Sequence, residues 1–108
     1  KMTMGWYLDG KVSALIGTHT HIQTADATIL PEGTAYITDS GMSGPYDSVV
    51  GMRKDVAMKR FTLQTAHKYE MAEHDVKVCG VNVKIDVSSG KAHSIESFII
   101  PDYKKQAD

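Results

Sequence analysis

The last third of the chain alternates apolar and polar residues with a period of two, and this pattern constrains the fold more than any other feature. Between residues 75 and 87 the apolar positions are Val76, Val78, Val81, Val83, Ile85 and Val87. Such alternation is typical of a strand with one face on a core, and Gly80 predicts a β-bulge within it. Turn-forming residues at 88–91 then predict a hairpin, with a return strand over residues 92–100 that Pro101 stops.

The earlier segments predict short elements of both kinds. End signals and residue spacing indicate a helix that ends at Asp9-Gly10, a helical turn over residues 46–50, and a helix over residues 55–64 that Asp55 caps. Short apolar runs predict three strands, at residues 12–16, 28–30 and 34–39. The first of these runs lies between glycines and is expected to be buried on both faces. The mixture predicts an α/β (α+β) fold.

The composition is that of an ordinary globular domain. Of the 108 residues, 42% are hydrophobic and 23% are charged, and the formal net charge is -1. A chain so close to neutral offers no basic surface for duplex nucleic acid or for a membrane, and its apolar runs are too short to span a bilayer. Cys79 is the single cysteine, and its strand context predicts a buried, inert thiol. With no sign of an oxidising compartment, a cytoplasmic protein is expected.

The segment Gly17-Thr18-His19-Thr20-His21 is the first candidate for chemistry. If the backbone there is extended, imidazoles two residues apart point the same way and can reach one metal ion or two adjacent ions. A position just after a buried strand is where α/β proteins place their sites, and Gly17 allows a sharp turn. The alternative is a pair of ordinary loop histidines, because a bare His-x-His arises easily by chance.

A site for even one metal ion needs at least three ligands. Within the chain the further candidates are Asp26, Asp39, His67, His74 and His93. We expect His67 and His93 at the surface, since they lie in a polar connection and in the hairpin. Asp39 has two interpretations: a residue that supports a histidine ligand from behind, or a plain turn residue.

The wider sequence resembles one bacterial family. Residues 17–21 resemble the Gly-x-His-x-His signature of calcineurin-like metallophosphoesterases, and further blocks resemble the YmdB-like branch in order, at residues 6–14, 29–31, 33–39 and 41–51. The resemblance continues to about residue 98. It implies that residues 1–108 are the C-terminal portion of a single metallophosphoesterase domain, a two-sheet sandwich flanked by helices, with the upstream half absent.

The resemblance also implies a chemistry. Both histidines of the signature bind metal in that family, so His19 and His21 would each hold one ion of a dinuclear centre, with iron or manganese, or alternatively zinc. Members hydrolyse cyclic nucleotides, which makes 2′,3′-cyclic nucleotides or cAMP the expected small-molecule substrates. The family's other ligands, an Asp, a bridging Glu, Asn residues and a further His, belong to upstream motifs that this sequence lacks. The isolated chain is therefore expected to be inactive.

A glycine-rich loop over residues 39–51 is the second candidate. The residues predicted to line a substrate pocket are Gly41, Met42, Gly44 and Tyr46. The glycines would offer main-chain amides to a phosphate, and the two side chains would contact a base. The alternative interpretation is a surface connection.

Two other functions stay open beside the phosphodiesterase. One is a mononuclear, amidohydrolase-like metallohydrolase, although a β-rich tail rather than a barrel follows the histidines. The other is a non-catalytic, β-rich oligomerisation module, because a terminal hairpin can pair with a neighbouring chain. In either setting exposed apolar surface predicts a homo-oligomer.

Overall fold

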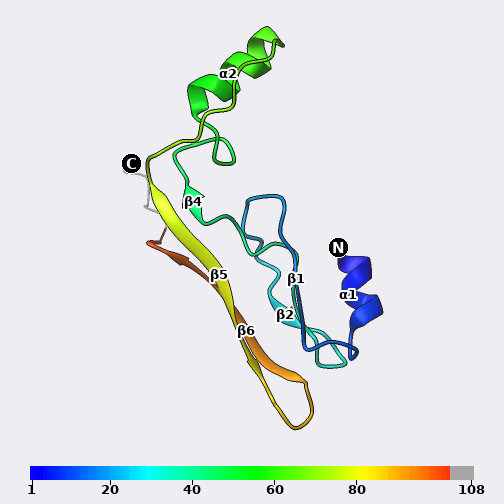
Figure 1. Cartoon of the computed structure of the whole chain (residues 1–108). Helices are drawn as coiled ribbons and strands as arrows, with labels where there is room; N and C mark the ends of the chain where they lie inside the picture. The colour runs from blue at the N-terminus through cyan, green and yellow to red at the C-terminus, as the bar shows by residue number, and fades with distance from the viewer. Residues whose placement is uncertain (103–108) are drawn as a thin grey trace.

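A computed structural model describes residues 1–102 of the chain. In this part the element order is α1 (Met2–Leu8), β1 (Ala14–Ile16), β2 (Thr28–Ile29), β3 (Ala35–Ile37), β4 (Gly44–Pro45), α2 (Lys54–Leu63), β5 (Val76–Ile85) and β6 (Ala92–Ile100). The strands form two three-stranded sheets, ordered β1-β3-β2 and β4-β5-β6. Figure 1 shows the long β5–β6 hairpin beside the β1-β3-β2 sheet, with α2 at the top and α1 at the right-hand side.

Strand β3 is the centre of the first sheet and of the core. Its three residues, Ala35, Tyr36 and Ile37, have at most 1% of their surface exposed. It pairs in parallel with β1 and antiparallel with β2. The prediction that the 12–16 run is buried on both faces was wrong: β1 is an edge strand, and Ile16 is 41% exposed. A short apolar run does not reveal whether both faces of a strand are covered or where the strand lies in its sheet.

The hairpin forms the second sheet, and its return strand has the predicted bounds. Strands β5 and β6 pair from Val78 with Ile100 to Ile85 with Ala92. The predicted bulge at Gly80 was wrong, because the register shifts between Lys84 and Ile85 instead. Gly80 pairs regularly with Phe98, and a Cβ there would stand 2.8 Å from the Phe98 ring. The glycine thus makes room for an aromatic ring rather than for an extra residue.

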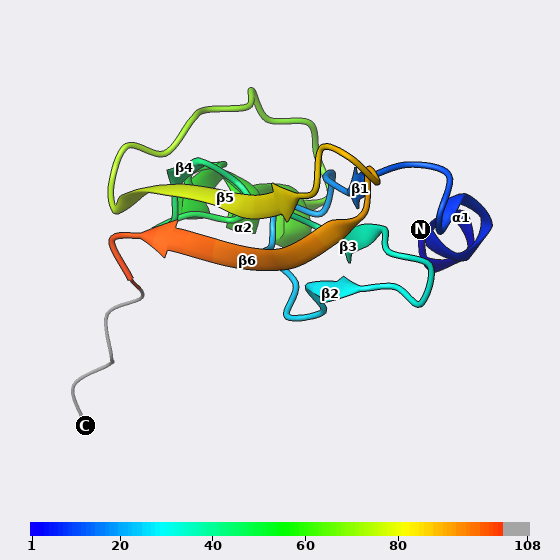
Figure 2. The same cartoon turned by 90° about the horizontal axis from the view of Figure 1, so that it is seen from below.

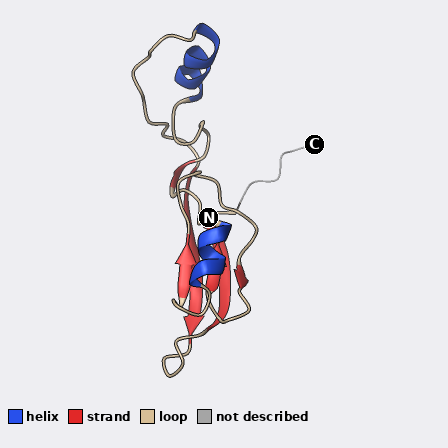
Figure 3. Cartoon of the chain, turned by 90° about the vertical axis from the view of Figure 1, so that its right-hand side faces the viewer, coloured by secondary structure: helices blue, strands red, loops and turns tan. Residues whose placement is uncertain are grey.

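The two sheets pack on each other, and α1 packs on the first. Strand β6 lies against β2 and β3, an arrangement that Figure 2 shows from below. Helix α1 lies beside the strands in Figure 3, and a Cβ on its buried Gly5 would approach the Tyr36 ring to 2.9 Å. The predicted mixed fold, with two sheets, helices and a closing hairpin, is confirmed.

Helix α2 projects beyond the sheets (Figures 1 and 3). Val56 is its one buried residue, whereas Phe61 is 83% exposed. The helix begins one residue earlier than predicted, so Arg53 is the N-cap and Asp55 lies in the first turn. Neither helix of the described part has the length and apolar character that crossing a bilayer requires.

Two local predictions next to α2 were wrong. Residues 46–50 form bends and a turn rather than a helical turn, because Val49 and Met52 pair through both of their main-chain groups. Cys79 is half-buried rather than buried, and its Sγ atom lies 2.8 Å from the Tyr46 hydroxyl.

Candidate metal-binding histidine loop

The histidine loop, residues 17–21, leaves the end of β1 beside the end of β3. The amide of Gly17 donates to the Ile37 carbonyl at 3.0 Å, and the Ser40 amide donates to the Gly17 carbonyl at 2.9 Å. A Cβ on Gly17 would stand 1.8 Å from the Thr38 carbonyl oxygen. Since the φ angle of Gly17 is not left-handed, this glycine is needed for close backbone approach rather than for the sharp turn that we expected.

Asp39 holds the middle of the histidine loop. Its Oδ2 atom accepts the Thr20 amide at 2.7 Å and the Thr20 hydroxyl at 2.6 Å, and its Oδ1 atom accepts the Gly41 amide at 2.8 Å. The side chain is 0% exposed, with the Lys1 ammonium 3.6 Å from Oδ2. Burial alone would raise the pKa of Asp39, but the bonds from Thr20 and Gly41 outweigh it and lower the pKa below its ordinary value.

Both histidines have a positive φ angle, a backbone conformation that residues other than glycine rarely adopt. The φ angles are 106° at His19 and 67° at His21, so the extended backbone that we expected is wrong. The tether of Thr20 to Asp39, a contact across 19 residues, accounts for the difference. Positive φ at a residue other than glycine costs about 1–3 kcal/mol and gathers at functional sites. Both side chains are exposed to solvent.

The ring of His21 is oriented by the main chain of Val50. Its Nδ1 atom lies 3.0 Å from the Val50 carbonyl oxygen. A carbonyl only accepts, so Nδ1 is the donor, and in the neutral tautomer the lone pair lies on Nε2. Metal-binding histidines characteristically donate their second ring N–H in this way, which fixes the tautomer. The tight turn that presents this carbonyl has φ angles of 45° at Val50 and 94° at Gly51.

Two imidazoles alone do not complete a metal site, which needs at least three ligands. Among residues 1–102 no group of three or more His, Cys, Asp or Glu side chains is arranged to hold a metal ion. Asp26 is committed to hydrogen bonds from Thr24 and Thr38, and Asp39 to those described above. The donors present therefore fit a metal through neutral ring nitrogens, and the remaining ligands would come from outside the described residues.

In the described part of the chain, no other histidine joins His19 and His21 in a group that could hold a metal ion. His93 is exposed on β6, as expected for a surface residue. His67 is half-buried, and its Nε2 atom lies 2.8 Å from the Thr65 hydroxyl. His74 lines the hollow beside α2.

Gln23 connects the histidine loop to the hairpin, and sequence reasoning missed it. Its Nε2 atom lies 2.9 Å from the Phe98 carbonyl, 3.2 Å from that of Ser40 and 3.4 Å from that of Gly80. The only signal was its position two residues after His21. A long-range contact of this kind has no local pattern.

The Asp39 carboxylate connects the predicted pocket loop to the histidine loop, because it bonds both Gly41 and Thr20. The amide of Gly41 is used by Asp39, and Gly44 pairs with Lys77 in the second sheet. The Tyr46 hydroxyl donates to the Met42 carbonyl at 2.7 Å. The loop is thus fixed by its own bonds at the side of the histidines.

The family of the chain follows from comparison with known proteins. A family model described as YmdB-like protein matches residues 1–98. The chain belongs to the YmdB-like family. This YmdB-like chain is 49% identical to the 2′,3′-cyclic-nucleotide 2′-phosphodiesterase of Bacillus subtilis (strain 168) over 102 residues, which are 94% of this chain and 39% of that protein.

Solved structures of longer proteins contain the same fold. A novel phosphatase from Mycoplasma pneumoniae matches with a TM-score of 0.88 and 34% identity, over 92% of the YmdB-like chain and 36% of the phosphatase. A hypothetical protein from Thermus thermophilus matches with a TM-score of 0.86 and 35% identity, over 92% and 38% of the two chains. The YmdB-like chain therefore spans under two fifths of the length of these relatives.

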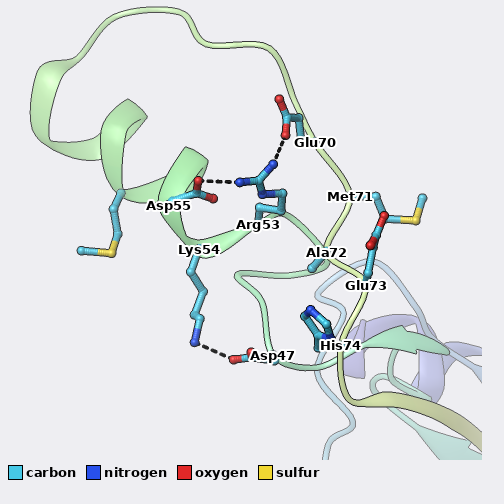
Figure 4. Close-up of a pocket in the computed structure, with 10 residues that line it drawn as sticks. Asp47, Arg53, Lys54, Asp55, Glu70, Met71, Ala72, Glu73 and His74 are labelled. Carbon is cyan, nitrogen blue, oxygen red and sulfur yellow. Dashed lines mark hydrogen bonds and ion pairs between the residues drawn. The ribbon is translucent and has the colours of Figure 1, made fainter.

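The YmdB-like chain also has an open hollow beneath α2, shown in Figure 4. Charged pairs cross it: Arg53 with Asp55 at 2.7 Å and with Glu70, and Lys54 with Asp47. None of its lining residues belongs to the histidine loop or to residues 41–46. The hollow is thus separate from the candidate metal site.

Proposed function

We propose that this chain contributes His19 and His21 to the dinuclear metal centre of a phosphodiesterase that hydrolyses cyclic nucleotides, either 2′,3′-cyclic nucleotides or cAMP. The observation that carries the proposal is the histidine loop itself. Two exposed imidazoles flank a residue tethered to a buried carboxylate, and one ring has its tautomer set by the Val50 carbonyl. The name of the B. subtilis relative supplies the substrate class.

The residues of this chain would have separate tasks. His19 would bind one ion and His21 the other, through ring nitrogens that add no negative charge. Two such ions, iron or manganese and alternatively zinc, would polarise the phosphodiester and activate water at neutral pH. The loop with Gly41, Met42, Gly44 and Tyr46 would form a wall of the substrate pocket, because Asp39 fixes Gly41 beside the histidines.

The proposed enzyme is larger than this chain. We propose that residues 1–108 are the C-terminal portion of one domain, whose other part supplies the remaining ligands, as the share of the relatives that is covered suggests. The exposed apolar residues of α2 support a homo-oligomer. A single half-buried cysteine supports a cytoplasmic location.

The family match favours this function over the two alternatives, the amidohydrolase-like enzyme and the non-catalytic module. The test uses a chimera in which this chain replaces the matching part of the B. subtilis protein, hereafter the exchange chimera. We expect it to bind two metal ions and to hydrolyse a 2′,3′-cyclic nucleotide. His19→Ala and His21→Ala should each reduce the metal content toward one ion per chain and lower the rate by orders of magnitude.

His93→Ala is the matched control, because His93 is an exposed histidine on β6, outside residues 17–21. It should keep both ions and the full rate. Two bound ions and a normal rate in His19→Ala and His21→Ala would overturn the proposed function.

A further inference from the structure

The hydrogen bonds between Asp39 and Thr20 indicate a role for a residue that is not itself one of the two proposed metal ligands. Thr20 stands between His19 and His21, and both of its hydrogen-bond donors reach the same oxygen of Asp39, at 2.7 and 2.6 Å. We propose that Asp39 is a positioning residue that sets the orientation of both metal-binding histidines. The inference rests on the proposed function, since it concerns how that site is held.

A carboxylate is the side chain that suits this position. Three donors, two from Thr20 and one from Gly41, converge on its two oxygens, and hydrogen bonds to an ionised acceptor are short and strong. An asparagine has one acceptor oxygen, and its NH₂ group would face an N–H donor on the other side. Asp39→Asn would therefore lose either the hold on Thr20 or the hold on Gly41.

The hold matters because the histidine loop is not relaxed. His19 and His21 have φ angles of 106° and 67°, and residues other than glycine keep such angles when surrounding contacts hold them there. Without the tether at Thr20, the backbone would return to commoner angles and the rings would turn. Ligands that are held in advance bind a metal more tightly than ligands that must be ordered on binding.

The chain provides a matched control in Asp26. Its carboxylate also accepts bonds from two threonines, at 2.6 Å from the Thr24 hydroxyl and 3.1 Å from the Thr38 amide. Both of these partners lie outside residues 17–21. Asp26→Asn therefore measures the general cost of neutralising a bonded aspartate in this layer, without releasing Thr20.

The test is the affinity of the exchange chimera for Mn²⁺ alone, measured by isothermal titration calorimetry. We expect Asp39→Asn to weaken Mn²⁺ binding by about 10–100-fold, as loss of a residue behind a metal ligand does. Asp26→Asn should leave the affinity near that of the parent, even if both variants melt at the same lowered temperature. At saturating Mn²⁺, Asp39→Asn should recover part of its kcat with an unchanged KM.

A second pair of variants covers the case in which Asp39→Asn fails to fold. Thr20→Val loses the hydroxyl bond and should bind Mn²⁺ more weakly, whereas Thr20→Ser keeps both bonds and should restore the affinity. Equal affinities in Asp39→Asn and Asp26→Asn, or in Thr20→Val and Thr20→Ser, would overturn the positioning role. If His19→Ala and His21→Ala still lose metal in that assay, only the inference fails; if they keep both ions, the proposed function fails as well.

Discussion

The side-chain amide of Gln23 lies 2.9 Å from the Phe98 carbonyl oxygen and joins the exit of the histidine loop to strand β6. The same nitrogen also approaches carbonyls of Ser40 and Gly80. One side chain thus connects the end of β3, both strands of the hairpin and the loop that carries the two histidines. The orientation of the hairpin and the geometry of the candidate site are therefore linked.

Gln23→Leu should destabilise the exchange chimera, because part-buried carbonyls lose their donor. The expected loss is about 1–3 kcal/mol of unfolding free energy, measured by thermal or urea unfolding. Asn82→Leu is the control, since Asn82 is an exposed amide on β5. Equal stability of the two variants would show that the Gln23 bonds contribute nothing.

Gly17→Ala should disrupt the loop more severely than any surface change. The new Cβ would meet the Thr38 carbonyl oxygen at 1.8 Å, a backbone atom of the residue that directly follows the last β1–β3 pair, Ile16 with Ile37. Overpacking of this kind costs about 1–3 kcal/mol or more. Gly44→Ala is the matched control, because its Cβ would meet only the Met42 side chain, at 3.8 Å. Equal melting temperatures of Gly17→Ala and Gly44→Ala would contradict the close approach of Gly17 to the Thr38 carbonyl.

Acid should weaken the fold through Asp26. Burial alone would raise the pKa of Asp26, but bonds from Thr24 and Thr38 lower it below the ordinary 3.8. Since the folded pKa is below the unfolded one, the stabilisation is full above the unfolded value and is lost as pH falls through the folded value. Melting temperatures should show Asp26→Asn less stable than the parent near neutral pH, with the difference shrinking below about pH 4. A difference that stays constant with pH would exclude this linkage.

The isolated 108-residue chain should bind metal weakly and should not hydrolyse cyclic nucleotides. It has two imidazoles in the loop, and within residues 1–102 no third His, Cys, Asp or Glu side chain is grouped with them to hold a metal ion. Elemental analysis and a turnover assay at high enzyme concentration check this. Robust turnover by the purified chain would show that it holds a complete site.

The isolated chain should also self-associate through α2. Phe61 is 83% exposed on a helix that contributes one buried residue, and such apolar surface favours association. Phe61→Gln should shift light scattering toward the monomer, whereas Lys59→Gln, an exposed change on the same helix, should not. A parent chain that is already monomeric at high concentration would refute this expectation.

The hairpin could be predicted because its information is local. Alternation and a turn placed β6 at residues 92–100, which are its observed bounds. The role of Gly80 was misread, because the ring that needs the space belongs to Phe98 on the other strand. The edge position of β1 depends on which strands are neighbours, and an apolar run does not contain that information.

The two histidines could be predicted as candidates, but not their geometry. Their spacing marked them, whereas the backbone that presents them depends on a bond between Thr20 and Asp39, 19 residues apart. The support of His21 by Val50 spans 29 residues and uses a main-chain atom. No residue type signals such a contact, because every residue has a carbonyl.

The support of His21 by a main-chain carbonyl rather than a side chain has an evolutionary consequence at position 50. The carbonyl that His21 contacts does not depend on the side chain at position 50, so any substitution that keeps the backbone angle would keep the tautomer. What selection would conserve is the left-handed turn, with its φ angle of 45°. Glycine and asparagine adopt that angle more readily than valine, so homologues with either residue would keep the same ligand at a lower conformational cost.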